Sequence, residues 1–277
     1  MKKEPLALSH KELIAPLLAK LSVNLSEYSF ANLYLFREAH DYQVVYLADE
    51  TICIEGKTYD GLTYCMPLFL PNTTVNSIEM HPFFPIPEQW LPLFLPEKWK
   101  YEYKEDDSDY LYNAQKLATY SGRHLSKKRN LVYQFLNSYT HFIAPLSQST
   151  INDALLVIDA WQSHNGKESD TQACIEAVRL YRELGLEGTV YYVEGKPAGL
   201  IIAEPITKDT CVLHFAKADI QYKGLYQFLF QDTAIRYQSC FVYLNMEQDL
   251  GEESLRKSKH SYQPEILLKK YRIFYLK

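Results

Sequence analysis

The sequence lacks any apolar run long enough to cross a membrane. A spanning helix needs about 20 consecutive apolar residues, and no window of the 277 residues approaches that length. The N-terminal stretch carries charges at Lys2, Lys3, Glu4, Lys11 and Glu12, and it lacks the apolar core of a secretory signal peptide. We therefore expect a soluble, cytoplasmic protein with no transmembrane segment.

Paired cysteines are also missing. The cysteines are odd in number and scattered, and no two form a Cys-x-x-Cys pair: Cys53, Cys65, Cys174, Cys211 and Cys240. This pattern disfavours both a disulfide framework and a zinc site. We expect reduced, buried thiols.

The motifs of several common catalytic sites are absent. The sequence has no Gly-x-Ser-x-Gly elbow, no Walker loop and no His-Glu-x-x-His helix. It has no ligand cluster for a catalytic metal either, so we expect no metal. A net charge of −5 disfavours a protein that coats nucleic acid or anionic membrane as a whole. Any anion-binding site must therefore be a local cluster.

What is present is enough apolar material for a sizeable core. Hydrophobic residues make up 47% and charged residues 23% of the chain, which excludes wholesale disorder. A length of 277 residues suits one large domain or two modest ones. In the first half, apolar spacing predicts helices over 10–21 and 28–38. An antiparallel meander of three strands follows at 42–47, 51–55 and 62–66, with one turn at Ala48-Asp49-Glu50.

Two stretches of the first half are expected to be irregular. Residues 81–99 carry five prolines and several aromatic residues, which are too many breaks for a regular element. Residues 102–109 are acidic, and we expect them to be exposed.

The second half has a regular order of predicted elements. Helices are predicted over 126–139 with Ser126 as N-cap, over 151–164 and over 169–184, the last two separated at Asn165-Gly166. Strands follow at 189–194, 198–204 and 210–215, then helix 222–238, strand 241–245, helix 252–259 and a last strand region at 266–275. The order β-β-β-α-β-α-β is that of the core of the GNAT fold.

One loop of this order matches a phosphate-binding pattern. In GNAT proteins, a Gln/Arg-x-x-Gly-x-Gly/Ala loop before the crossover helix holds the pyrophosphate of acyl-coenzyme A on backbone N–H groups. Here the sequence reads Gln221-Tyr222-Lys223-Gly224-Leu225-Tyr226. Gln221, Lys223 and Gly224 are candidate donor-binding residues. Tyr226 stands where a small residue is expected and would crowd a pyrophosphate, and a simple helix start explains Gly224 equally well.

Several longer segments resemble one family. They are Asp109-Tyr110-Leu111-Tyr112-Asn113, residues 117–130, His214-Phe215-Ala216-Lys217-Ala218 and residues 243–264. They resemble an uncharacterised bacterial family related to the C-terminal domain of phosphatidylglycerol lysyltransferases. The most specific part is the Ser-Gly-x-x-x-x-Lys-Lys-Arg-Asn segment. The resemblance does not imply a lipid acceptor.

The resemblance implies an α+β fold of two tandem GNAT-like domains, 1–125 and 126–277. Each would be a mixed, mostly antiparallel sheet flanked by helices. Fem-type aminoacyltransferases, which use aminoacyl-tRNA, are built in this way.

A basic segment at the start of the helix 126–139 is a second candidate donor site. Its residues are Arg123, His124, Lys127, Lys128, Arg129 and Asn130. Cations at a helix N-terminus attract a phosphate of coenzyme A or of a tRNA end, although a solvated helix start is an equal alternative. Because about one to three phosphates can be neutralised there, extended duplex binding is not expected. Arg256 and Lys259, three apart on one predicted helix face, are further candidate anion binders or ordinary surface charges.

Candidate catalytic residues lie at the ends of predicted strands. His214 and Lys217 end the strand before the Gln221–Tyr226 loop, and His214 is either a base or a hydrogen-bonded core histidine. Glu204, together with Asn245, Glu247 and Asp249, would converge at the splayed centre of a GNAT sheet, and Asn245 is also a candidate donor-binding residue. A carboxylate there can deprotonate an acceptor, whereas Asp249 is better explained as a helix cap.

These features predict an acyl- or aminoacyl-transferase. The donor would be acyl-coenzyme A or aminoacyl-tRNA, and the acceptor an unidentified amine or hydroxyl. The alternative is a non-catalytic GNAT-fold protein that binds a phosphorylated ligand or partner. Lipid modification at a membrane surface is a third and weaker possibility, because no basic amphipathic helix is predicted.

Overall fold

The computed structural model describes residues 2–47, 51–71, 81–165 and 170–276. The predicted turn at 48–50, the predicted break at Gly166 and the predicted helix start at Ser169 lie outside the described residues. The chain forms two compact units. Unit 1 comprises 1–109, 248–253 and 267–277, and unit 2 comprises 110–247 and 254–266. These units differ from the predicted ranges, because 110–125 belong with unit 2 and the last strand belongs with unit 1.

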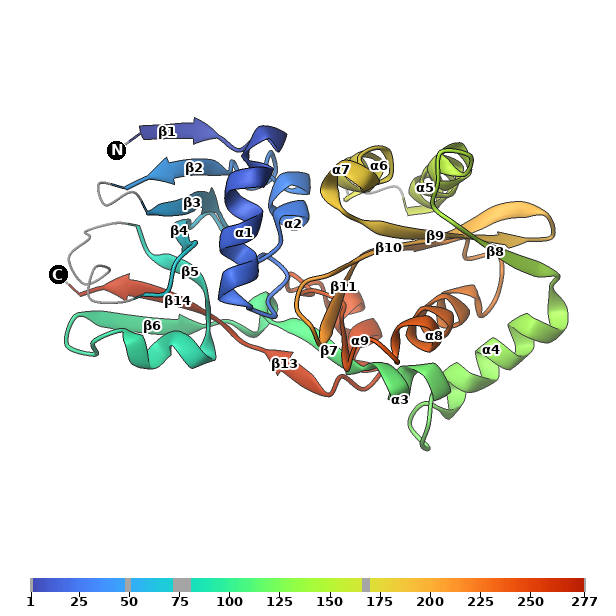
Figure 1. Ribbon diagram of the computed structural model, residues 1–277. Helices are drawn as coiled ribbons and strands as arrows, with labels where there is room; N and C mark the ends of the chain where they lie inside the picture. The colour runs from blue at the N-terminus through green and yellow to red at the C-terminus, as the bar shows by residue number, and fades with distance from the viewer. Residues whose placement is uncertain (1, 48–50, 72–80, 166–169, 277) are drawn as a thin grey trace. The chain divides into compact units, whose positions relative to one another are not determined.

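Unit 1 is built on a seven-stranded sheet (Figure 1). In sheet order its strands are β1 (Lys2–Pro5), β2 (Gln43–Tyr46), β3 (Ile52–Lys57), β4 (Thr63–Pro67), β5 (Phe83–Pro87), β14 (Lys270–Tyr275) and β6 (Trp99–Tyr103). Its α-helices are α1 (Lys11–Leu21) and α2 (Phe30–Leu35). It also contains the short 3-10 helices η1 (Leu8–His10), η3 (Glu88–Leu93) and η4 (Glu105–Asp107). The predicted meander is confirmed, since β2 pairs with β3 and β3 with β4 antiparallel.

The predicted irregularity of 81–99 is wrong. Phe83–Pro87 form β5, which is buried along its whole length between β4 and β14. Prolines are tolerated there because the ladders on both sides are broken. β4 and β5 pair at Cys65 and Phe83, and the register with β14 shifts between Tyr271 and Ile273. A proline lacks only the N–H that a regular ladder would need.

The prediction that residues 102–109 are exposed is wrong for the last three residues, 107–109, which are buried. Asp107 and Asp109 are 3% and 0% exposed. Arg272 Nε lies 2.9 Å from Asp107 Oδ2, and Lys270 Nζ lies 2.6 Å from Asp109 Oδ1. A buried carboxylate needs such a partner. Here both partners come from β14, more than 150 residues further along the chain, where no local pattern could indicate them.

Unit 2 contains a second seven-stranded sheet. In sheet order its strands are β13 (Ile266–Leu268), β7 (Asp109–Asn113), β12 (Tyr243–Asn245), β11 (Thr210–Ala218), β10 (Lys196–Pro205), β9 (Glu187–Val193) and β8 (His141–Pro145). β11 and β12 pair parallel, whereas β8 to β11 pair antiparallel in sequence order. The predicted strand region 266–275 is thus two strands in two sheets, and β8 was not predicted.

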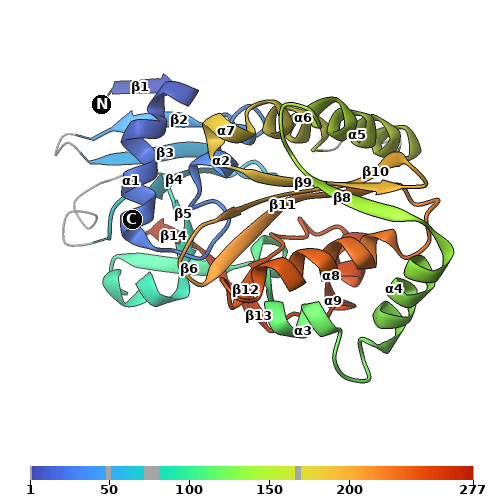
Figure 2. The ribbon, with the colours of Figure 1, turned by 45° about the vertical axis from the view of Figure 1, so that its right-hand side comes forward.

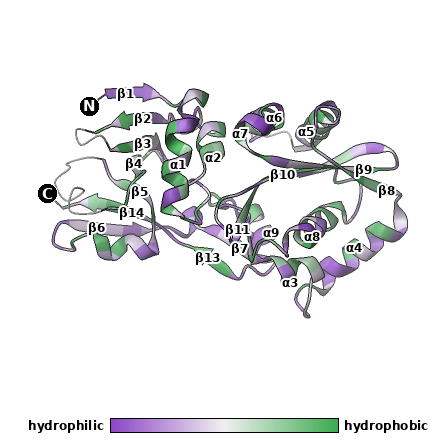
Figure 3. Cartoon of the chain, in the orientation of Figure 1, coloured by the Kyte–Doolittle hydropathy of each residue, from purple (hydrophilic) through white to green (hydrophobic). Residues whose placement is uncertain are grey.

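Helices cover both faces of the unit 2 sheet (Figure 2). They are α3 (Ala114–Thr119), α4 (Ser126–Ser138), α5 (Ile151–Asn165), α6 (Thr171–Arg179), α7 (Tyr181–Leu184), α8 (Leu225–Tyr237) and α9 (Glu253–His260). α5 and α8 pack on β10 and β11 from opposite faces. In Figure 3 the first turn of α4 is hydrophilic. The predicted α+β architecture is confirmed, since each unit contains a sheet flanked by helices.

Gly224 fixes the contact between α4 and α8. It precedes α8 with a φ of +92°, and a Cβ placed on it would lie 2.2 Å from the carbonyl oxygen of Leu131 in α4. Two constraints therefore require glycine: a left-handed backbone and the close approach of another helix.

We expect Gly224→Ala to lower the free energy of unfolding by about 3 kcal/mol, because left-handed strain and overpacking each cost roughly 1–3 kcal/mol. Gly122→Ala is the matched control, since Gly122 has a φ of +88° with nothing within 4 Å of its added Cβ. Its cost should be about 1 kcal/mol. Urea unfolding of both variants measures the difference, and equal losses would show that the Leu131 contact is unimportant.

Candidate active site

The central strands of unit 2 part near the middle of β11. β12 pairs with β11 only from Thr210 to Val212, ending at the Val212–Asn245 pair, and β11 then continues to Ala218. On the other side, β10 shifts register between Ile202 and Ala203, which brings Glu204 opposite Val212. His214 lies just beyond the point of parting. A β-bulge of this kind re-aims side chains next to active sites.

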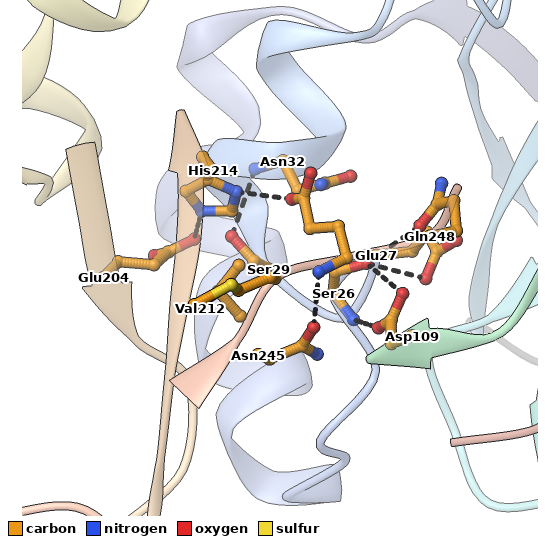
Figure 4. Close-up of polar contacts among 12 residues, drawn as sticks. Ser26, Glu27, Ser29, Asn32, Asp109, Glu204, Val212, His214, Asn245 and Gln248 are labelled. Carbon is orange, nitrogen blue, oxygen red and sulfur yellow. Dashed lines mark hydrogen bonds and ion pairs between the residues drawn. The ribbon is translucent and has the colours of Figure 1, made fainter. Parts of the chain in front are cut away.

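His214 is held between two carboxylates. Its Nε2 lies 2.8 Å from Glu204 Oε1 and its Nδ1 lies 2.8 Å from Glu247 Oε1. Figure 4 shows Glu204 and His214 facing each other from β10 and β11. The His214 side chain is 0% exposed, against 13% for Glu204 and 17% for Glu247. Burial alone would lower the pKa of His214, but the two carboxylates outweigh it and raise the pKa to about 10. The imidazole is therefore a cation at neutral pH and donates both N–H groups.

Glu247 has a strained backbone that its neighbours hold in place. Its φ is +58°, in the left-handed region that non-glycine residues rarely adopt. Its N–H donates to Asn245 Oδ1 at 2.7 Å, and its carbonyl accepts from Lys259 Nζ at 3.0 Å and from the Tyr110 N–H at 3.2 Å. Such strain persists where surrounding contacts over-determine it. Asn245 and Lys259, predicted to bind the donor, thus hold Glu247 in the structure.

Lys217 is paired within the protein. Its side chain is 4% exposed, and its Nζ lies 2.6 Å from Asp170 Oδ1 and 3.5 Å from the centre of the Trp161 ring. Asp170 is the N-cap residue of α6, so the ion pair ties the start of that helix to β11. The ring of Trp161 and the carboxylate of Asp170 together compensate the buried ammonium.

The loop predicted to cradle a pyrophosphate is occupied by protein contacts. Tyr226 OH accepts a hydrogen bond from Trp161 Nε1 at 2.8 Å, and burial raises the pKa of the Tyr226 phenol. The Gln221 N–H donates to Asp219 Oδ1 at 2.9 Å. Gly224 faces the Leu131 carbonyl, as described above. The side chains of Gln221 and Lys223 are exposed.

The basic segment divides into engaged and exposed residues. Lys128 Nζ lies 3.8 Å above the Tyr262 ring, and burial lowers the pKa of Lys128. Arg129 donates to the carbonyls of Tyr120 and Gly122. Three further members of the predicted set, Arg123, Lys127 and Asn130, are exposed.

The predicted cap at Ser126 is wrong. Leu125 is the N-cap residue of α4, and Ser126 is the first helical residue, with its hydroxyl donating to the Arg123 carbonyl at 2.7 Å. Arg256, also predicted to bind the donor, is half-buried on α9 with Lys259. The structure therefore gathers Glu204, His214, Asn245, Glu247 and Lys259. It leaves Arg123, Lys127 and Asn130 exposed at the start of α4.

Unit 1 contains a buried charge cluster that the sequence did not indicate. Lys270 Nζ lies 2.7 Å from Glu27 Oε1 and 2.9 Å from Gln248 Oε1, besides the contact with Asp109. Figure 4 shows Ser26 beside Asp109, with its N–H donating to Asp109 Oδ2 at 2.7 Å. Burial, supported by Asp109, outweighs Lys270 and raises the pKa of Glu27 to about 7. Asp109 and Gln248 lie in segments that carry the family resemblance, but nothing in the sequence indicated that they would meet Glu27 and Lys270.

Among residues 2–47, 51–71, 81–165 and 170–276, no three His, Cys, Asp or Glu side chains are placed to hold a metal ion. Also within them, no helix combines the length and hydropathy needed to cross a membrane. The cysteines are free, and four are buried, but Cys240 is exposed, so the expectation of burial is wrong for that residue.

The chain matches one known protein family over most of its length. The family described as "Phosphatidylglycerol lysyltransferase, C-terminal" matches residues 19–274. The chain belongs to this family. The predicted tandem GNAT-like fold is confirmed by the solved structures that the chain resembles, FemX among them.

Three solved structures of other proteins are similar to this chain. A crystal structure of a conserved protein of unknown function from Bacteroides thetaiotaomicron is 27% identical over the whole of both chains, with a TM-score of 0.86. The C-terminal domain of a putative lysylphosphatidylglycerol synthetase from Agrobacterium fabrum is 12% identical, with 96% of this chain and 92% of that one covered and a TM-score of 0.66. FemX is 8% identical, with 100% and 98% covered and a TM-score of 0.63.

An uncharacterised protein, MYCGA3080 of Mycoplasmoides gallisepticum, is 25% identical over 174 residues. The match covers 60% of this chain and 56% of that protein, so the chain spans just over half the length of that relative.

We expect the free energy of unfolding of the Glu27→Gln variant to increase, relative to that of the unchanged protein, as the pH rises. The pKa of Glu27 is raised from 4.5 to about 7 in the folded state. The unchanged protein therefore loses stability as the pH rises from 4.5 to 7, because Glu27 must ionise in the folded state, and it shows no such loss below pH 4.5. At about 1.4 kcal/mol per pKa unit, the difference should grow by about 3 kcal/mol between pH 4.5 and 8. Denaturant unfolding at several pH values measures it. Glu265→Gln, at an exposed carboxylate, is the control, and a pH-independent difference for Glu27→Gln would contradict the account.

Proposed function

We propose that the chain is an aminoacyltransferase that moves an aminoacyl group from an aminoacyl-tRNA to an amine or hydroxyl acceptor. The observation that carries this proposal is the Glu204–His214–Glu247 cluster where β11 and β12 part. Membership of a family described by a lysyltransferase domain supports the reaction type, and the fold shared with FemX supports the same architecture.

Glu204 is the proposed proton acceptor. It keeps partial exposure, whereas His214 is enclosed and already protonated at neutral pH. The acceptor nitrogen or oxygen attacks the ester carbonyl carbon, and its proton passes to the Glu204 carboxylate. The bond between that carbon and the ribose oxygen then breaks, and the ribose oxygen takes the proton back from Glu204. Atoms and charge balance without a further reactant.

His214 and Glu247 orient the base in this scheme. A cation that donates one N–H to each carboxylate fixes the Glu204 oxygen at 2.8 Å. Glu247 is fixed in turn through Asn245 and Lys259. This layered support is the arrangement that keeps a catalytic group in a productive geometry. Lys217, because it is paired with Asp170, contributes by positioning β11 and α6.

The contacts of the Gln221–Tyr226 loop favour an aminoacyl ester over a coenzyme A thioester. Two contacts support this preference: the Cβ direction of Gly224 points at the Leu131 carbonyl oxygen, and Tyr226 is anchored to Trp161. A carbonyl oxygen at that place repels an anion. No step is therefore assigned to coenzyme A.

A second candidate is a non-catalytic protein that binds a phosphorylated ligand. The observation in its favour is that His214 and Lys217, two of the three predicted catalytic residues, are both enclosed and engaged in ion pairs. In that case Glu204 would serve only to hold His214.

We expect Glu204→Gln to lower aminoacyl transfer by about 10²–10⁴-fold, the usual contribution of a general base. The assay follows labelled aminoacyl groups from a charged-tRNA pool onto a panel of amine and hydroxyl acceptors. Glu265→Gln is the control. A thermal-shift titration in parallel should show stabilisation by charged tRNA, about 2.7 kcal/mol at 100 times the Kd, and none by acetyl-coenzyme A.

Two results would overturn the proposal. Transfer from acetyl-coenzyme A that Glu204→Gln abolishes would make the chain an acyl-coenzyme A enzyme. Binding of charged tRNA without transfer to any acceptor would select the binding-protein candidate.

A further inference from the structure

We propose that the exposed face of α4 is the docking surface for the RNA part of the donor, with Tyr133 as the ring on which an unpaired base stacks. The inference rests on the proposed function, because it assumes a donor that carries RNA. It goes beyond it by assigning residues outside the Glu204 cluster, on another element of unit 2.

One side of α4 is turned to solvent. Val132 and Phe135 are 3% and 0% exposed and face the protein, whereas Tyr133 is 67% exposed. Ser126, Asn130 and Tyr133 are spaced i, i+4 and i+7, so they lie on one helix face. Figure 2 shows α4 alongside α8, on which it packs.

This face is hollowed. A shallow depression of about 480 Å³ is lined by Ser126, Lys127, Arg129, Asn130 and Tyr133. Hydroxyl and amide groups on its walls can donate and accept hydrogen bonds, and the Tyr133 ring supplies an aromatic surface. Cations beside an exposed ring are the combination with which proteins hold single-stranded nucleic acid.

The charge of the depression contrasts with that of the molecule. The chain has a net charge of −5, yet Arg123 and Lys127 are exposed cations at the start of α4. Arg129, although it also supports the Tyr120 carbonyl, lines the same depression. A local positive patch on an acidic protein selects a compact phosphate-bearing ligand over a long duplex.

An RNA strand fits this surface better than a bilayer does. Of the large apolar side chains of α4, Tyr133 and Leu136 are exposed, at 67% and 46%. Membrane-surface helices bury a continuous apolar face, which two side chains do not provide. A hollow lined by Ser126 and Asn130 offers hydrogen bonds that a nucleobase or ribose can use.

The test is fluorescence anisotropy with a labelled RNA hairpin that ends in a short single-stranded 3′ tail. Tyr133→Ala should weaken binding about tenfold through lost stacking, and Tyr133→Phe should keep it. Lys127→Ala should weaken binding. It should also reduce the slope of the logarithm of the affinity against the logarithm of the salt concentration by about one. Lys196→Ala, at an exposed lysine of β10, is the matched control. Equal affinity of all variants, or no binding by the unchanged protein, would overturn the proposal.

Two further arms separate the alternatives. If anionic phospholipid vesicles bind the protein and Tyr133→Ala abolishes that binding without changing RNA affinity, the surface is a membrane contact and the proposal fails. With 3′-aminoacyl-adenosine as a donor without an RNA body, Tyr133→Ala and Lys127→Ala should keep full turnover, and with the full donor their KM should rise about tenfold. Loss of turnover with both donors would contradict a docking role. If the unchanged protein transfers an aminoacyl group from neither donor, the proposed function fails. The RNA affinities measured by anisotropy still test whether α4 is a docking surface.

Discussion

The His214 imidazolium and its two carboxylates form the contact on which the candidate site depends. Three ionisable groups this enclosed are stable only because each is paired, and removing the cation would leave two like charges together. The pairing requires β10 and β11 to be out of regular register and β12 to end at Asn245. It also requires Glu247 to hold a left-handed backbone, which Asn245 and Lys259 enforce. The ion pairs of the site therefore depend on the irregularities of the sheet.

Unit 1 uses the same device for a structural purpose. Lys270 and Arg272, two residues apart on β14, hold Asp109 and Asp107 and bring the end of the chain into the sheet that its beginning forms. Removing either cation would strand a buried carboxylate. These pairs explain why residues 267–277 belong to unit 1 although they follow unit 2 in sequence.

Local patterns predicted much of the fold and little of the site geometry. Helix 126–139 and strands 198–204 and 210–215 were predictable because their apolar periodicity is strong, and Glu204 and His214 were found as polar residues at strand ends. β5 was missed because its prolines sit in a broken ladder. The burial of Asp107 and Asp109 was missed because their partners are remote in sequence. Lys259 and Asn245 were identified as site residues, yet their contacts with the Glu247 backbone depend on tertiary structure that no spacing encodes.

In the proposed mechanism, Glu204 accepts the proton while His214 stays a cation. Its most direct test is the pH dependence of aminoacyl transfer between pH 5 and 9. Because the pKa of His214 is raised to about 10, we expect no inflection of the transfer rate near pH 6.5, the ordinary pKa of a histidine. An inflection near pH 6.5 that disappears in His214→Gln and persists in Glu204→Gln would show that His214 is the base, and would contradict the account.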